Sequence, residues 1–104
     1  MALILNGGNF LPTVKLSTSQ DVTVGASSAQ SAAIGTAGQT PNKIIRLVST
    51  TACRIALGTN PTATSTSTFL PANVVEFTEI SPGEKIAVIQ DTGGGKLNVS
   101  ECIL

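Results

Sequence analysis

Apolar and polar residues alternate in a series of short runs along the chain. The clearest run covers residues 43–51, in which every second residue from Ile45 to Ser49 falls on the same side. A period of two is that of a β-strand with one buried face. Further runs of this kind lie at residues 13–17, 21–24, 53–57, 74–79, 84–90 and 96–102. Since no window carries the apolar stripe of a helix, the pattern predicts an all-β fold.

Turn-forming residues separate these runs. Residues 81–84 read Ser-Pro-Gly-Glu, where Pro82 fixes φ and Gly83 is free to adopt a positive φ. Residues 70–73 predict a second turn, and the Asp-Thr-Gly-Gly-Gly stretch at 91–95 predicts a hairpin loop that joins the last two strands. Turn signals at intervals of about 8–12 residues favour a small β-sandwich or jelly-roll-like barrel of about seven or eight strands.

The chain of 104 residues has room for one domain. We expect residues 1–12 to form an N-terminal arm or a first edge strand, and residues 13–104 to form a single β-sandwich domain. Residues 26–42 are less clearly patterned and fit an irregular strand around 31–35, a short helix or a long loop, of which the strand is preferred. The hydroxyl-rich segment 59–70 connects two strands, and a solvated loop is favoured there over a binding role.

The charge of the chain narrows the classes of function. Six basic and six acidic residues give a formal net charge of zero, so we expect no nucleic-acid partner and no membrane partner. Charged residues make up only 12%, which is about half the usual share and slightly favours a surface partly covered by other subunits. The four apolar residues 2–5 lack the basic start and the length of a signal peptide or membrane span. We therefore expect the protein to fold in the cytoplasm.

Residues able to carry catalysis are scarce. The chain has no His, Trp or Tyr, so acid–base chemistry near neutral pH would need a strongly perturbed carboxylate, Lys or Cys. Glu76 and Glu79 differ by three positions, face opposite sides of a strand, and are interpreted as solvated charges. Cys53 and Cys102 are interpreted as small buried hydrophobic residues, with a disulfide as the alternative. We expect no enzyme activity, no catalytic residue, no metal and no cofactor.

The three phenylalanines are the only aromatic residues. Phe77 lies in a strand pattern and is interpreted as core. Phe69 precedes a proline turn and fits the edge of the core or an interface anchor equally well. Phe10 follows two glycines and fits either an arm that packs against a neighbour or the first strand of the protein's own sheet. So few rings argue against a protein that binds sugars or single-stranded nucleic acid by stacking.

The strand at residues 3–5 is apolar on both faces and would invite edge pairing if it were exposed. Strand addition to a second subunit, or pairing within the same sheet, would cover it. We therefore expect a homo-oligomer, with a trimer suggested by analogy to small β-domains on shells. The candidate protein-contact residues are Leu3, Ile4, Leu5, Phe10, Asn60, Pro61, Phe69 and Leu70.

Part of the chain resembles small virion proteins of tailed bacteriophages. The residues that carry the resemblance are IRLVSTTACRIALG at 45–58, NPTAT at 60–64, FLPA at 69–72, PGEKIAVI at 82–89 and LNVSE at 97–101. The similarity covers residues 20–102 and is strongest from residue 43 onward, whereas residues 1–12 lie outside it. Proteins of this kind are typically β-sandwich modules of the particle.

The resemblance implies a structural role without catalysis. The leading expectation is a capsid cement (decoration) protein, made in the host cytoplasm, that binds the major capsid protein on the outside of the virion shell. The alternatives are a receptor- or polysaccharide-binding module of a head or tail fibre and a neck or adaptor component. The resemblance does not choose among these positions, because the matching residues look like the strands and turns of a shared fold.

Overall fold

The computed structural model describes the chain at residues 3–6, 9–12 and 15–103, with side chains described from residue 15 onward. Ten strands and no helix occur within these ranges. Two short strands, β1 (Leu3–Asn6) and β2 (Asn9–Pro12), pair with each other as an antiparallel hairpin. The other eight are β3 (Lys15–Val24), β4 (Ala29–Gln30), β5 (Lys43–Ser49), β6 (Cys53–Gly58), β7 (Thr68–Leu70), β8 (Glu76–Ile80), β9 (Lys85–Gln90) and β10 (Gly95–Ile103).

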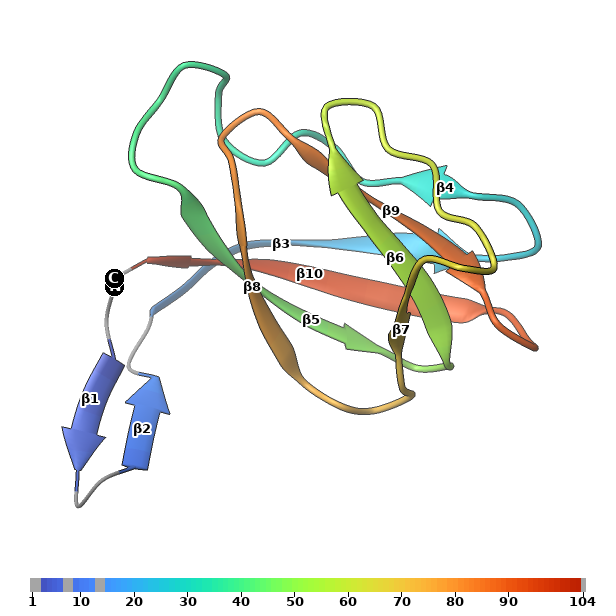
Figure 1. Cartoon of the computed structure of the whole chain (residues 1–104), viewed down its shortest axis with the longest axis horizontal. Coiled ribbons are helices and arrows are strands. Elements are labelled where there is room, and N and C mark those ends of the chain that lie inside the picture. Colours follow the sequence, from blue (N-terminus) through green and yellow to red (C-terminus); the bar gives the residue numbers. More distant parts are fainter. Residues whose placement is uncertain (1–2, 7–8, 13–14, 104) are drawn as a thin grey trace.

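These eight strands form two antiparallel sheets of four strands each (Figure 1). The first sheet has the order β3-β10-β5-β8, and the second has the order β4-β9-β6-β7. The predicted all-β fold and the small β-sandwich are thereby confirmed. The pairing also places β7 and β8 at edges of their sheets.

The connection at residues 91–95 corrects one prediction. It was expected to be a hairpin loop, but β9 belongs to the second sheet and β10 to the first, so it carries the chain across the sandwich. The connection between β5 and β6 crosses at the same end. The two crossings bond to each other, because the Lys96 amide donates to Thr50 Oγ1 at 3.0 Å and Thr51 Oγ1 donates to the Gly93 carbonyl at 3.1 Å.

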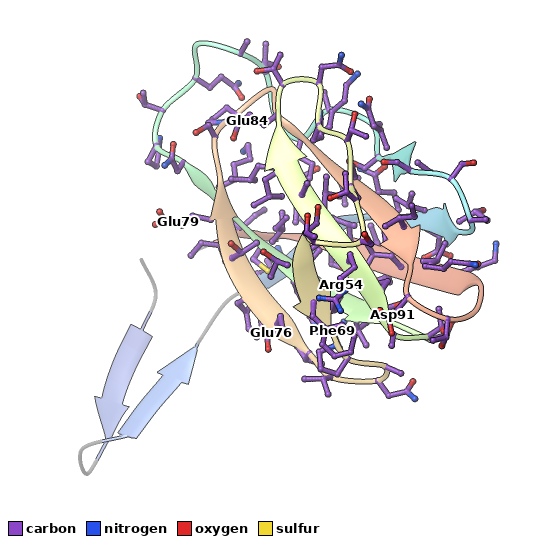
Figure 2. All side chains as sticks on the ribbon, turned by 45° about the vertical axis from the view of Figure 1, so that its right-hand side comes forward. Arg54, Phe69, Glu76, Glu79, Glu84 and Asp91 are labelled. Carbon is purple, nitrogen blue, oxygen red and sulfur yellow. The ribbon has the colours of Figure 1, made fainter. Side chains whose placement is uncertain are left out.

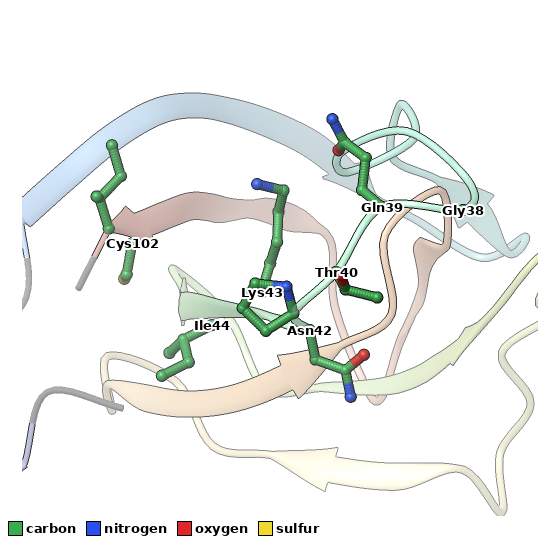
Figure 3. Close-up of a pocket in the computed structure, with 9 residues that line it drawn as sticks. Gly38, Gln39, Thr40, Asn42, Lys43, Ile44 and Cys102 are labelled. Atoms are coloured by element: carbon green, nitrogen blue, oxygen red, sulfur yellow. The ribbon is translucent and has the colours of Figure 1, made fainter.

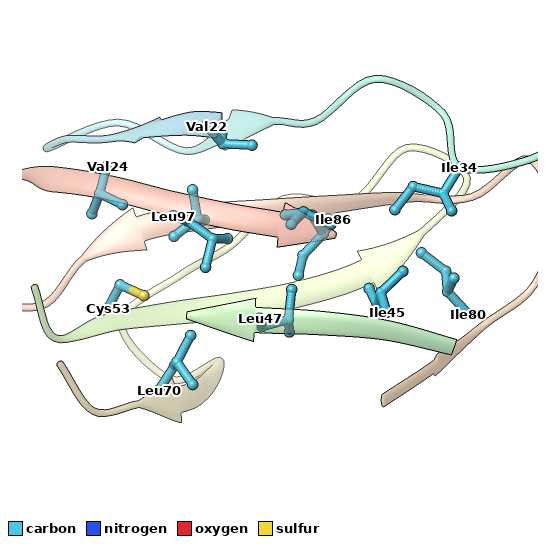
Figure 4. Close-up of a cluster of buried hydrophobic side chains, with 12 residues drawn as sticks. Val22, Val24, Ile34, Ile45, Leu47, Cys53, Leu70, Ile80, Ile86 and Leu97 are labelled. Carbon is cyan, nitrogen blue, oxygen red and sulfur yellow. The ribbon is translucent and has the colours of Figure 1, made fainter. Parts of the chain in front are cut away.

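The core lies between the two sheets (Figure 4). The alternation expected for residues 43–51 is confirmed, since Ile45, Leu47 and Ser49 are buried while the residues between them are half-buried. Opposite residues of an antiparallel pair share a face, and the register places Leu47 and Ser49 opposite two buried residues of β10, Val99 and Leu97. The apolar members of the cluster are Val22, Val24, Ile34, Ile45, Leu47, Cys53, Leu70, Ile80, Ile86, Val88, Leu97 and Val99.

The strand expected around residues 31–35 is misplaced. The strand in this region is β4, which spans only two residues and pairs with Val88 and Ala87 of β9. Farther on, Ser31 is buried and its hydroxyl accepts the Ile86 amide at 3.0 Å, while Ile34 forms an isolated bridge with Glu84. A side-chain hydroxyl thus replaces one backbone carbonyl as acceptor, and the ladder is interrupted there.

Candidate interaction surface

The hydroxyl-rich segment is a mostly exposed loop up to residue 67, tied to the region of β4 by hydrogen bonds and by two buried side chains. Gln30 Nε2 donates to Asn60 Oδ1 at 2.8 Å and to the Pro61 carbonyl at 2.7 Å. The Ala63 amide donates to Ser28 Oγ at 2.9 Å, and the side chains of Pro61 and Ala63 are buried. Small residues let this segment lie close to the sheet. Its last three residues, expected to belong to the connection, form strand β7 instead.

Two of the predicted contact residues in this region are wrong. Leu70 is 1% exposed, because β7 pairs it with Cys53 on the face that points into the core. Pro61 is buried as well. Asn60 is exposed but already bonded to Gln30. Phe69 is 45% exposed and remains available for a contact, because it lies on the outer face of the second sheet.

The remaining predicted contact residues lie in the hairpin. Leu3, Ile4 and Leu5 belong to β1, and Phe10 of β2 is paired with Leu5. Among the described residues the hairpin is a sheet of its own and joins neither four-stranded sheet. Phe10 is therefore not in a strand of the sandwich sheets. The side chains of these four residues lie outside the described part of the chain, so their contact role stays a prediction.

An open groove of about 400 Å³ lies between the edge strands of the two sheets. We call it the β7–β8 groove. Leu57 is 40% exposed there and Phe77 is 42% exposed, and Phe69 stands at its rim. Glu76 is the one charged residue in its lining, on β8 (Figure 2). The lining residues are Leu47, Ile55, Ala56, Leu57, Thr68, Phe69, Leu70, Glu76, Phe77 and Thr78.

The groove is open because β7 is too short to cover its neighbour. β7 pairs with β6 at Cys53, Arg54 and Ile55 only, so the edge of β6 from residue 56 to 58 has no strand beside it. Leu57 pairs with the buried Ile86 of β9 and thus points to the core side, yet it is two-fifths exposed. At this side of the sandwich the core is therefore in contact with solvent.

Sequence reasoning missed Leu57 and misassigned Phe77. Phe77 was expected in the core, but it pairs with Arg46 on the outer face of the first sheet. The sequence did indicate that Phe77 faces solvent, because the charged Glu79 is two positions away and therefore lies on the same face of the strand. The core-facing side of β8 instead carries Glu76, Thr78 and the buried Ile80.

Arg54 holds the Phe69 ring in place at the rim of the groove. Its guanidinium carbon lies 4.7 Å from the centre of the ring, and its Nε lies 3.4 Å from Asp91 Oδ1 (Figure 2). Both charged side chains are about one-third exposed, so solvent screens the pair and its contribution is below about 1 kcal/mol. The arrangement occupies one face of the Phe69 ring.

A second hollow of about 510 Å³ lies between the loop at residues 38–42 and the end of β10 (Figure 3). Lys43 is the one charged residue in its lining, and Cys102 and Ile103 close one end. The rest of the lining is polar loop, with Gln39, Thr40 and Asn42 around it. It has neither exposed rings nor a free strand edge, so we regard the β7–β8 groove as the better candidate surface.

The described residues offer little for chemistry. They contain no group of three or more His, Cys, Asp or Glu residues placed to hold a metal ion. The Glu84 carboxylate accepts a hydrogen bond from the Ser81 amide at 3.1 Å and so stabilises a turn.

Cys53 and Cys102 are buried and free, which confirms their interpretation as small buried hydrophobic residues over the alternative of a disulfide. Burial raises the pKa of both thiols, against the opposing hydrogen bond from Ser49 to Cys53 and the positive charge of Arg46 near Cys102.

We expect both thiols to react slowly with a maleimide at pH 7 in the folded protein and rapidly after unfolding, because burial shields the sulfur and keeps it protonated.

The raised pKa of the two thiols in the folded state also makes the free energy of unfolding depend on pH. The thiol pKa is about 8.5 in the unfolded chain. The protonated thiols contribute stability that is complete below this value and is lost as the pH rises through their pKa in the folded protein. Between pH 7 and 10, the free energy of unfolding should therefore fall more in the wild type than in the Cys53→Ala/Cys102→Ala variant. An equal fall in both proteins would contradict this linkage.

The chain matches no protein-family model, no curated protein and no solved structure. Its described residues form no helix of the length and apolar character needed to cross a membrane.

Proposed function

We propose that the protein is a structural component of a tailed-bacteriophage particle, and specifically a capsid cement protein. In this role it is made in the host cytoplasm, assembles as a homo-oligomer and binds the major capsid protein on the outside of the shell. The observation that carries the proposal is the exposed apolar lining of the β7–β8 groove, to which Leu57, Phe69 and Phe77 contribute.

An exposed apolar patch is typical of a surface that contacts another protein. Here it belongs to a chain with a net charge of zero and only 12% charged residues, which suits an interface with depleted charge. The resemblance of residues 45–58 and 82–89 to phage virion proteins supplies the kind of partner. The hairpin residues Leu3, Ile4, Leu5 and Phe10 are the second candidate contact.

The proposed cement protein stabilises the shell by mass action. A protein that binds only the assembled, expanded shell stabilises that state, by about 2.7 kcal/mol per site when its free concentration is 100 times Kd. Glycan binding by a fibre module is less well supported, because Arg54 covers one face of Phe69, the more exposed of the two rings described from residue 15 onward.

The test compares expanded empty shells of the particle with and without the purified protein. We expect co-sedimentation with the shells and a higher melting temperature of the shell when the protein is bound. Phe69→Glu should weaken binding at least tenfold, whereas Leu16→Glu, at another exposed apolar position on β3, should leave it unchanged. Shells that neither bind the wild-type protein nor gain stability from it would refute the proposal.

A further inference from the structure

The edge of β8 beside the groove is free. Among the described residues β8 pairs with β5 alone, from Lys43↔Ile80 to Leu47↔Glu76, so its other edge presents unpaired backbone groups. Across the groove, residues 56–58 of β6 pair with β9 on one side but have no strand neighbour on the groove side. A free edge of this kind next to exposed apolar side chains is a template for one more strand.

A strand of suitable character lies in the same chain. Residues 3–5 read Leu-Ile-Leu, and residues 1–12 contain no charged residue. Within the described residues β1 pairs only with β2. An isolated two-stranded hairpin is at best marginally stable in water, and a strand that is apolar on both faces needs cover on both.

We propose that the β7–β8 groove receives the Leu3–Asn6 strand of a second copy of this chain, added along the free edge of β8. The two faces of the site match the two faces of the strand. On the core side, the added strand would meet Glu76, Thr78 and Leu57, and on the outer side it would meet Phe77. Backbone pairing gives affinity in such strand addition, and the alternating side-chain contacts give specificity.

The buried area indicates that the strands are exchanged. A four-residue extended segment of this composition exposes about 650 Å². If roughly two-thirds of it is covered and the groove loses a similar area, one docked strand buries on the order of 800 Å² in total, which is below the size of a stable interface. Two strands exchanged reciprocally bury on the order of 1,600 Å², the standard size. Each copy should therefore give one strand and receive one.

The geometry favours a second copy over the same chain. β1 is already paired with β2 in the single chain, and β3, which continues from the hairpin, lies at the opposite edge of the first sheet from β8. Three strand spacings, about 14 Å, separate those two edges. Docking within one chain is the alternative that the experiment must distinguish.

The first experiment measures the molar mass of the purified full-length protein by light scattering. We expect a closed oligomer for the wild type and a monomer for Leu57→Asp in the groove and for Ile4→Asp in the strand. Leu16→Asp is the matched control, because Leu16 is 54% exposed on β3 and should keep the wild-type mass. An equimolar mixture of the two variants can form only one intact contact between strand and groove, so it should associate far more weakly than the wild type. A monomeric wild type, or an unchanged mass for Leu57→Asp, would overturn the proposal.

The second experiment does not depend on how well Leu57→Asp folds. Leu5→Cys and Thr78→Cys are made in separate molecules, mixed and oxidised, with the native thiols buried. A disulfide between the two variants, absent when either is oxidised alone, is the expected result. If the Leu5→Cys/Thr78→Cys double variant forms the bond within one chain instead, the second copy is not the occupant. Both measurements use the purified chain without shells, so their outcome is separate from that of the proposed capsid role.

Discussion

Replacing Leu97 by alanine is expected to lower the free energy of unfolding by about 3–5 kcal/mol. Leu97 is 0% exposed and lies on β10, which pairs with β3 on one side and β5 on the other. It packs among side chains of both sheets, so the surrounding structure has little freedom to collapse into the space that the substitution leaves. A domain of this size has about 5–15 kcal/mol in all, and the loss is a large fraction of it.

The measurement is chemical denaturation followed by far-UV circular dichroism, with thermal melting as a second probe. At about 4 °C per kcal/mol, the melting temperature should fall by roughly 12–20 °C. Leu16→Ala is the matched control, because the same atoms are removed from a side chain that is 54% exposed, and its effect should stay within about 0.5 kcal/mol. A loss below about 1 kcal/mol for Leu97→Ala would contradict the assignment of this residue to the core.

Residue alternation predicted the strands well but not their partners. The run that became β5 was recognisable because one face of the strand meets the core and the other does not. The glycine-rich stretch at 91–95 also marked a reversal correctly. A reversal within one sheet and a crossing between two sheets use the same turn residues, so the local sequence could not show that β9 and β10 lie in different sheets.

The candidate surface was harder to predict, because exposure at a sheet edge depends on which strand lies beside it. Leu70 reads as a loop residue before a proline, and the pairing of β7 with Cys53 is what buries it. Leu57 has the position of a core residue, and the shortness of β7 is what exposes it. Both outcomes depend on contacts between segments that are distant in sequence. The resemblance to phage virion proteins concerns function and stays a prediction until shell binding is measured.

Gly83→Ala is expected to cost about 2–3 kcal/mol, although it adds a single methyl group. Gly83 has φ of 92° in the Pro82–Gly83 turn that the sequence predicted, and the Glu84 amide closes this turn on the Ser81 carbonyl at 3.0 Å. For an alanine, such a backbone conformation is less favourable by about 1–2 kcal/mol, because its Cβ lies too close to the following carbonyl oxygen.

A second cost comes from the neighbouring loop. A Cβ at position 83 would lie 2.8 Å from the Ala37 amide nitrogen and 2.9 Å from its Cα. The turn could relieve this contact only by moving away from the loop, which would strain the bond from the Gly83 amide to the Ile34 carbonyl, 2.7 Å long. Ile34 is 0% exposed, so the disturbance would reach the core.

Gly93→Ala separates these causes from the general effect of replacing a glycine. An added Cβ there meets nothing within 4 Å, and Gly93 is not among the glycines with positive φ. Gly93→Ala should therefore be neutral or slightly stabilising, because it reduces the conformational freedom of the unfolded chain. Denaturation of the two variants side by side tests the turn. Equal stabilities would contradict both the positive φ of Gly83 and its close approach to Ala37. A loss of about 2–3 kcal/mol confined to Gly83→Ala would exceed the cost of the backbone conformation alone and would support the contact between this loop and the turn before β9.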